Sequence, residues 1–398
     1  MEINISNSFI LLKSYCESEN FKGWDPYDGM NSKVFQALPL KHWDLARLAW
    51  IQGFKRSPIN FRKLLLVPKE HNTKGLALFL LGYCRLYKLA ENGNEDFGTK
   101  DQILQRINEL SELLLGLRSK GYSGSAWGYN FDWQARRLFL FKKYTPTVVA
   151  TCFCVEALLE AYEITKNETV LKETVTAADF VVKDLSRTKH GSGIIFSYSV
   201  LDGNNTVINA SLLGAKILSY SYKYTKNQTH ADLAKQAVMA ACDLQSEDGS
   251  WIYGLLPVQS WIDSFHTGYN LDAIQAYQNN TGDLSFQDNI NKGFDYYIKN
   301  FFETDGTPKY YHNKTYPIDI HCPAQLFVTL SKLNRFYENK KLAEKVMDWS
   351  VANMQDKKGY FYYQLKKGIS SKISYMRWSN AFMFHAMSCY VKENQTNS

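Results

Sequence analysis

Apolar residues recur at helical spacing, three or four positions apart, along most of the chain. Near 103–114 the apolar positions are Ile103, Ile107, Leu110 and Leu114, and the stretch near 286–301 repeats this spacing. Most of the positions between them are polar. Each stretch therefore predicts a helix with one buried face, and we expect these helices to lie on the outside of the fold.

A second set of segments is apolar on nearly every side and rich in small residues, as in a helix that packs against several neighbours. Six such inner helices are expected, near 72–91, 147–164, 207–225, 264–280, 319–337 and 375–391. Landmark residues at the starts of the last four are separated by 57, 55 and 57 positions: Asn209, His266, His321 and Trp378. A repeat of this length indicates one helical hairpin per unit.

Segments with glycine followed by aromatic residues connect the units and predict β-hairpins, as at 193–198 and 359–362. We therefore predict an all-α fold, an (α/α)6 toroid of six helical hairpins with short β-hairpins in the connecting loops. The whole chain, 1–398, is expected to form a single domain. A helix near 41–54 is expected to close the ring against 375–391, because a closed ring needs no capping repeats.

Composition restricts the partners. Hydrophobic residues make up 45% and charged residues 21% of the chain, as in globular proteins. The net charge of +7 is spread without a basic stripe, which argues against nucleic acid and suits an anionic substrate. The seven cysteines form no CxxC pair and predict free thiols in a reducing compartment. No signal sequence or membrane-spanning run is visible, so we expect a cytoplasmic protein without cofactor or metal.

In a toroid the inner helices run parallel, so the segments before their N-termini meet at one rim, where helix dipoles favour anionic or hydroxyl-rich ligands. Several segments there combine aromatic rings with hydrogen-bonding groups, as sugar recognition requires. We expect catalytic roles for Asp25, Asp132, Asp263, His266 and His321. Substrate-binding roles are expected for Tyr27, Asp28, Trp127, Tyr129, Trp133, Gln134, Arg136, Trp251, Trp261, Tyr269, Asn270, Asp319, Arg377 and Trp378.

The most specific chemical hypothesis is that Asp263 and His266 act together in proton transfer. They lie three residues apart at a helix start and so share one face. The carboxylate would orient the imidazole for proton transfer. A helix cap beside a packed ring explains the same two residues without catalysis.

Two resemblances bear on the fold and its context. QSEDGSW at 245–251 fits the QxxxGxW repeat of terpene cyclases, which are α/α toroids, but their acidic DxDD signature is absent. GWDPYDG at 23–29, WGYNFDWQ at 127–134 and QSWIDSFHTGYN at 259–270 resemble the VpsJ-like proteins of capsule and exopolysaccharide biosynthesis, nearly end to end. This resemblance implies a polysaccharide context within the six-hairpin superfamily, which includes glycoside hydrolases, sugar epimerases and polysaccharide lyases.

Three functions remain open. The first is a glycosidase-like enzyme that acts on a surface or capsular polysaccharide, or its oligosaccharide precursor, through two carboxylates. The second is a uronate C5-epimerase or lyase, in which Arg136 or Arg377 neutralises the substrate and His266, His321, Tyr129 and Tyr269 are candidates for moving protons. The third is a non-catalytic polysaccharide-binding or assembly protein.

Overall fold

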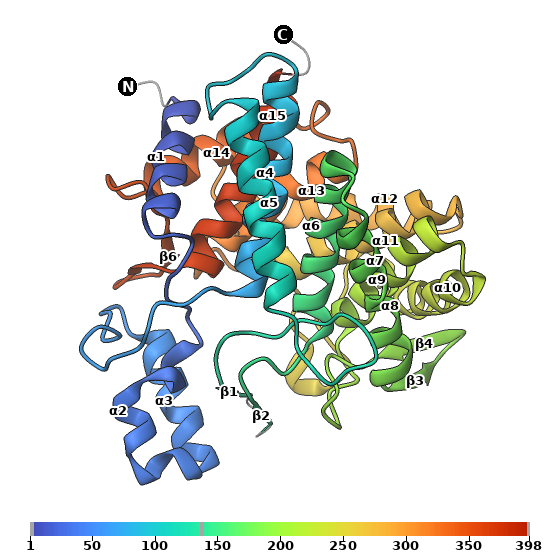
Figure 1. Cartoon of the computed structure of the whole chain (residues 1–398), viewed down its shortest axis with the longest axis horizontal. Helices are drawn as coiled ribbons and strands as arrows, with labels where there is room; N and C mark the ends of the chain where they lie inside the picture. The colour runs from blue at the N-terminus through green and yellow to red at the C-terminus, as the bar shows by residue number, and fades with distance from the viewer. Residues whose placement is uncertain (1–3, 136–138, 396–398) are drawn as a thin grey trace.

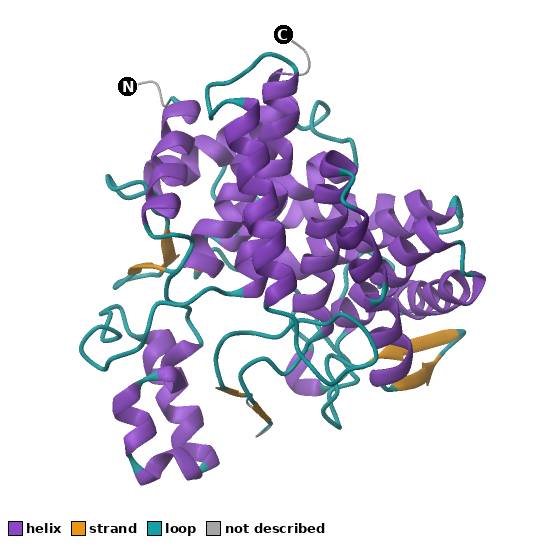
Figure 2. Cartoon of the chain, in the orientation of Figure 1, coloured by secondary structure: helices purple, strands orange, loops and turns teal. Residues whose placement is uncertain are grey.

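The computed structural model describes residues 4–135 and 139–395 and is dominated by helices (Figure 2). Within these ranges, an inner ring consists of six helices: α4 (Thr73–Glu91), α6 (Val148–Thr165), α9 (Ile208–Thr225), α11 (Ser264–Thr281), α13 (His321–Lys332) and α15 (Phe382–Gln395). Each contacts the next in this order, and α15 contacts α4, so the ring is closed. The predicted (α/α)6 toroid is confirmed.

The outer layer consists of helices that bury only one face. They are α1 (Ile5–Ser18), α5 (Lys100–Gly116), α7 (Glu168–Val175), α8 (Ala177–Asp179), α10 (Gln228–Asp243), α12 (Gln287–Phe301) and α14 (Lys340–Met354), with the turn η3 (Phe180–Asp184) after α8. In α5 the buried positions include Ile103, Ile107, Leu110 and Leu114, the face predicted from their spacing. No helix among the described residues is long and apolar enough to cross a membrane.

The ring closes through a different helix from the one expected. The helix predicted near 41–54 is α3 (Asp44–Arg56), but its main contacts are with η1 (Asp28–Asn31), η2 (Pro39–His42) and β1 (Trp133–Gln134). Instead α1 packs on α14 and α15, with Phe9 5.2 Å from Phe384 between ring centroids. The closure by 41–54 is wrong, because α1 buries Phe9, Leu12 and Cys16 where it meets α14 and α15, whereas α3 packs mainly on η1, η2 and β1.

Strands are confined to short antiparallel pieces, as predicted. β1 pairs with β2 (Leu140–Phe141), and β3 (Arg187–His190) pairs with β4 (Gly193–Phe196). β6 (Tyr362–Leu365) lies between β5 (Ile318–Asp319) and β7 (Ser371–Ser374). β1 carries Trp133 and Gln134 and β5 carries Asp319, so these strands hold predicted site residues near the helix starts.

Gly293 of α12 lies where a side chain has no room. A Cβ built on it would stand 2.4 Å from Cζ3 of Trp251, a buried indole that donates its Nε1 hydrogen to the Ala241 carbonyl oxygen at 2.8 Å. We expect Gly293→Ala to lower the free energy of unfolding by about 1–3 kcal/mol, because the indole must shift. In Gly53→Ala of α3 the new methyl group meets nothing within 4 Å, and we expect stabilisation of up to about 1 kcal/mol. Urea unfolding of both variants tests this packing, and a Gly293→Ala protein as stable as the wild type would contradict it.

Candidate active site

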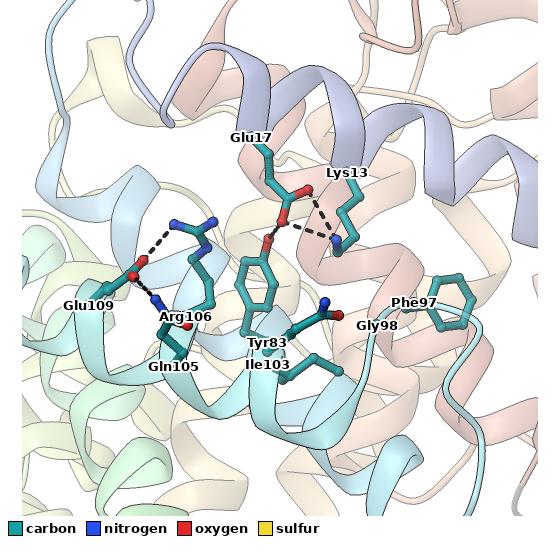
Figure 3. A pocket seen from close by; sticks show the side chains of 10 residues that line it. Lys13, Glu17, Tyr83, Phe97, Gly98, Ile103, Gln105, Arg106 and Glu109 are labelled. Atoms are coloured by element: carbon teal, nitrogen blue, oxygen red, sulfur yellow. Dashed lines mark hydrogen bonds and ion pairs between the residues drawn. The ribbon is translucent and has the colours of Figure 1, made fainter.

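Three cavities have volumes of about 320 to 350 Å³, and the one lined by Trp24, Lys69 and Met376 includes, among the described residues, none predicted to act in the site. The first of the other two, about 320 Å³, is lined by residues of α1, α4 and α5 (Figure 3). Its charged groups neutralise one another: Glu17 accepts hydrogen bonds from Lys13 at 3.0 Å and Tyr83 at 2.6 Å, and Arg106 pairs with Glu109 at 2.6 Å. No residue predicted to act in the site lines this cavity.

The second cavity, about 350 Å³, lies where the inner helices begin, and we name it the mouth cavity. All six inner helices supply residues at or near their first turn: Lys74 (α4), Val149 (α6), Asn209 (α9), His266 (α11), His321 (α13), and Arg377 and Trp378 in η5 (Met376–Ala381), which leads into α15. Other predicted residues that line it are Tyr27, Tyr129, Trp133, Gln134, Trp261 and Tyr269. The rim expected from the parallel inner helices is thus a hollow lined by residues distant in sequence.

Asp263 and His266 form a bonded pair at the start of α11. The Asp263 side chain caps the helix by accepting the His266 backbone N–H at 3.0 Å, and its other oxygen accepts from His266 Nδ1 at 2.7 Å. That second oxygen also accepts from Trp261 Nε1 at 2.9 Å. A carboxylate only accepts hydrogen bonds, so Nδ1 carries a proton. With its proton on Nδ1, the neutral form of the ring would present its Nε2 lone pair as a base beside the cavity that it lines.

Three buried side chains that line the mouth cavity are joined by hydrogen bonds. Lys74 Nζ donates to Tyr269 Oη at 3.2 Å, and Tyr269 Oη shares a hydrogen bond of 2.6 Å with His321 Nε2. Burial raises the pKa of Tyr269 well above its usual value, so the phenol keeps its proton. Burial, with a contribution from the nearby Lys74, lowers the pKa of His321 well below its usual value. Tyr269 therefore carries a proton beside the cavity, opposite in character to His266.

Lys74 was not foreseen from the sequence. Burial, with a contribution from Arg377, lowers the pKa of its amine far below the usual range, and the Phe153 ring centroid lies 4.1 Å from Nζ. A lysine just before the apolar run Leu76–Leu81 of an inner helix could have signalled this position. Lys55 of α3 also lines the cavity without having been predicted, and its Nζ donates to Tyr27 Oη at 2.5 Å.

Two buried amides face the mouth cavity with unused donors. Gln134 and Asn209 are 2% and 3% exposed, and both line the cavity. Gln134 accepts from Arg47 Nε at 2.8 Å through its oxygen, but neither Gln134 Nε2 nor Asn209 Nδ2 has a partner among the described residues. Buried polar groups are normally satisfied, so a ligand with hydroxyl or carboxylate oxygens would complete these donors.

Two predicted carboxylates lie in buried ion pairs behind the cavity wall. Asp25 binds Arg377 through two hydrogen bonds, of 2.6 and 2.8 Å, and Asp28 accepts from Arg62 Nε at 2.6 Å. Arg62 also donates to the Asp25 carbonyl oxygen at 2.7 Å. These pairs hold the N-terminal segment against η5, and both carboxylates are occupied by guanidinium groups rather than lining the cavity.

The remaining predicted residues lie outside the lining. Trp127 and Trp251 are buried, with their Nε1 hydrogens donated to backbone oxygens at 2.8 Å. Asp132 pairs with Lys142 at 3.2 Å and accepts the Lys143 backbone N–H. Asn270 is buried in α11 with its Oδ1 unpartnered among the described residues, and Arg136 lies outside the described residues.

Asp319 supports the cavity from behind. It accepts hydrogen bonds from Trp378 Nε1 at 2.8 Å and from the His321 backbone N–H at 3.1 Å, while burial raises its pKa to about 6. The folded state therefore holds this proton more tightly than the unfolded chain does. The stabilising contribution is complete below about pH 4 and is lost as the pH rises through about 6, a change of roughly 3 kcal/mol.

Asp319→Asn should remove this pH dependence. We expect the free energy of unfolding of the variant to fall less steeply than that of the wild type between pH 4 and pH 7. Urea titrations at unit pH intervals measure both curves. Parallel curves would show that Asp319 does not titrate in this window.

Comparison with known proteins identifies the fold. No family model matches the chain, and no curated protein matches it in sequence. Solved structures match in three dimensions. A sugar epimerase from a ruminal bacterium has a TM-score of 0.60 at 12% identity, over 83% of this chain and 91% of that one. An unsaturated glucuronyl hydrolase specific for heparin has a TM-score of 0.62 at 12% identity, over 98% and 97%.

A polysaccharide lyase has a TM-score of 0.55 at 12% identity, over 81% of this chain and 91% of that chain. Identities this low establish the architecture alone. The protein is thus an (α/α)6 toroid, similar in fold to these three proteins. Among the described residues, no three His, Cys, Asp or Glu side chains converge as metal ligands.

Proposed function

We propose that the chain is an enzyme that acts on a saccharide and moves a proton at a sugar carbon, as an epimerase or lyase of an acidic sugar. The observation that carries this proposal is the lining of the mouth cavity. It contains His266, His321 and Tyr269, and its described residues include no Asp or Glu. Sugar epimerases and polysaccharide lyases are among the proteins of similar fold, which supports this chemistry as an analogy.

The proposed reaction begins with loss of the hydrogen on the carbon next to the sugar carboxylate, C5 of a uronate. His266 Nε2 accepts this proton, and the electron pair of the C–H bond moves toward the carboxylate. Lys55, which has no carboxylate partner among the described residues, offsets the developing negative charge. In an epimerase, Tyr269 returns a proton to the opposite face of C5. In a lyase, the C4–O bond breaks, C4=C5 forms, and Tyr269 protonates the leaving oxygen.

Glycosidase chemistry has weaker support in this cavity. It needs two carboxyl groups on either side of the glycosidic bond. Asp25, Asp132 and Asp263 each have a cationic or imidazole partner, and none of them lines the cavity. The alternative is a protein that binds a polysaccharide without catalysis, and the experiment below distinguishes it from an enzyme.

A polysaccharide or its oligosaccharide precursor fits the space available. A further cavity of about 150 Å³ is lined in part by Trp133, Tyr198 and Tyr253, which also line the mouth cavity, so more than one sugar ring can be accommodated. Together with the resemblance to VpsJ-like proteins, this favours a capsular or surface polysaccharide as the substrate, processed in the cytoplasm. The free thiols fit that compartment.

Incubation with acidic and neutral glycans in deuterated water, followed by NMR, tests the proposal. Deuterium at C5 of a uronate identifies an epimerase, and a C4=C5 double bond identifies a lyase. A new reducing end without either signal would favour a hydrolase and contradict the proposal. Saturable binding of a glycan without any product would favour the non-catalytic alternative.

A further inference from the structure

Residues 33–69 form a projection outside the toroid. In Figure 1, α2 (Lys33–Ala37) and α3 hang below the body at the lower left, joined by η2 at the far end. The loop after α3 returns to the start of α2, where the Lys33 N–H donates to the Leu66 carbonyl oxygen at 3.3 Å. Closing the ring does not require this projection, because α1 fills the outer position.

The projection carries most of the apolar surface that the molecule exposes. Of the sixteen large apolar side chains exposed among the described residues, nine belong to it: Val34, Leu38, Leu40, Trp43, Leu45, Ile59, Phe61, Leu64 and Leu66. Trp43 and Leu45, at the far end, are 63% and 72% exposed. Single exposed apolar residues are ordinary, but a concentration of this kind marks an interaction surface.

The same segment is strongly basic. It contains eight Lys and Arg residues and one acidic residue, Asp44. Arg47, Arg62 and Lys69 are paired with carboxylates. The other five, which have no carboxylate partner among the described residues, are Lys33, Lys41, Lys55, Arg56 and Lys63. The β6–β7 turn adds to this surface, since Lys366 Nζ donates to the Arg56 carbonyl oxygen at 3.4 Å and Ile369 is exposed.

We propose that the projection, residues 33–69, docks the protein on an anionic lipid surface. Trp and Leu side chains at the far end would enter the boundary between headgroups and acyl chains, and the cations outside the mouth cavity, Lys33, Lys41, Arg56 and Lys63, would contact the headgroups. A polyanion in water, such as nucleic acid, would pair with the cations but leave the apolar side chains exposed. A second copy of this face would meet the same positive charge, so self-association is disfavoured.

Docking would set the mouth cavity beside the lipid surface. α3 supplies Ile51, Gln52 and Lys55 to the cavity lining, and its opposite end lies beside Trp43. The inference stands on surface composition and does not depend on the reaction proposed above.

Co-sedimentation of the full chain with vesicles tests the docking. One set of vesicles contains phosphatidylglycerol and phosphatidylcholine in equal amounts, and the other contains phosphatidylcholine alone. We expect binding to the anionic vesicles only, weakened at least tenfold by raising the salt from about 0.05 to 0.5 M. Trp43→Ser/Leu45→Ser should lower the partition coefficient roughly 100-fold, because two large apolar side chains no longer insert. Lys33→Glu/Lys63→Glu should lower it at least tenfold.

The matched control is Val258→Ser/Leu284→Ser, which removes two equally exposed apolar side chains outside the projection and should bind as the wild type does. Melting temperatures show that the variants remain folded. No binding to anionic vesicles, or binding that the projection variants do not weaken, would overturn the proposal. A dimer in sedimentation equilibrium that Trp43→Ser/Leu45→Ser dissociates would assign this face to a second copy and would also overturn it.

Discussion

Asp263→Asn is expected to lower turnover by roughly 10²–10⁴-fold and to leave the fold intact. The wild-type carboxylate accepts three hydrogen bonds, two from His266 and one from Trp261. Asn has a single acceptor oxygen. If that oxygen keeps the helix cap, the amide NH2 faces His266 Nδ1, which must then become an acceptor. The ring proton moves to Nε2, and the base that faces the cavity is lost.

The two residues should behave as one unit. We expect His266→Ala to lose a similar factor in turnover, and the double variant to be scarcely worse than either single variant. Melting temperature and turnover are measured together on all three proteins. If Asp263 serves only as a helix cap, Asp263→Asn should change the free energy of unfolding by no more than roughly 1 kcal/mol and leave turnover normal. A stable and fully active Asp263→Asn protein would remove the pair from the mechanism.

The largest stability effect is expected for the ion pair behind the cavity wall. Asp25 and Arg377 are 3% and 4% exposed, and burial disfavours the guanidinium charge. The Asp25 carboxylate outweighs this penalty and raises the pKa of Arg377. Asp25→Asn leaves the cation buried without a counter-charge, so the free energy of unfolding should fall by about 3–5 kcal/mol.

The double variant Asp25→Asn/Arg377→Met tests whether the lost stability comes from the unpaired buried charge. Because it removes both charges, we expect it to recover most of the stability lost in Asp25→Asn. Glu109→Gln breaks the exposed pair with Arg106 and should change stability by less than about 1 kcal/mol. These free energies come from urea unfolding. A loss of less than 1 kcal/mol in Asp25→Asn would mean that the pair does not hold the N-terminal segment in place.

The fold could be predicted from the sequence because the repeated spacing follows from the packing of one helical hairpin after another. The spacing of Asn209, His266, His321 and Trp378 reflects one hairpin per unit, and apolar character on all sides reflects burial on all sides. The closing helix was missed because α1 and α3 have similar lengths and mixed composition. Only their tertiary neighbours distinguish them, and the sequence pattern does not encode which outer helix meets α15.

The sequence predicted which residues lie together at the rim better than which carboxylates face the cavity. Parallel inner helices dictate that their first turns meet, which placed His266 and His321 at one rim. Which carboxylates face the cavity depends on partners distant in sequence, as Asp25 with Arg377 shows. Lys74 was missed because its burial among rings from other helices leaves no local pattern beyond a lysine in an apolar helix.

Deuterium exchange into an acidic glycan, compared between wild type and His266→Ala, tests the central claim most directly. We expect the wild-type protein in deuterated water to place deuterium at C5 of the uronate or in the eliminated product. His266→Ala should exchange at least 100-fold more slowly while retaining its melting temperature. Exchange by His266→Ala at the wild-type rate would show that the mouth cavity does not transfer this proton through His266, and would contradict the account.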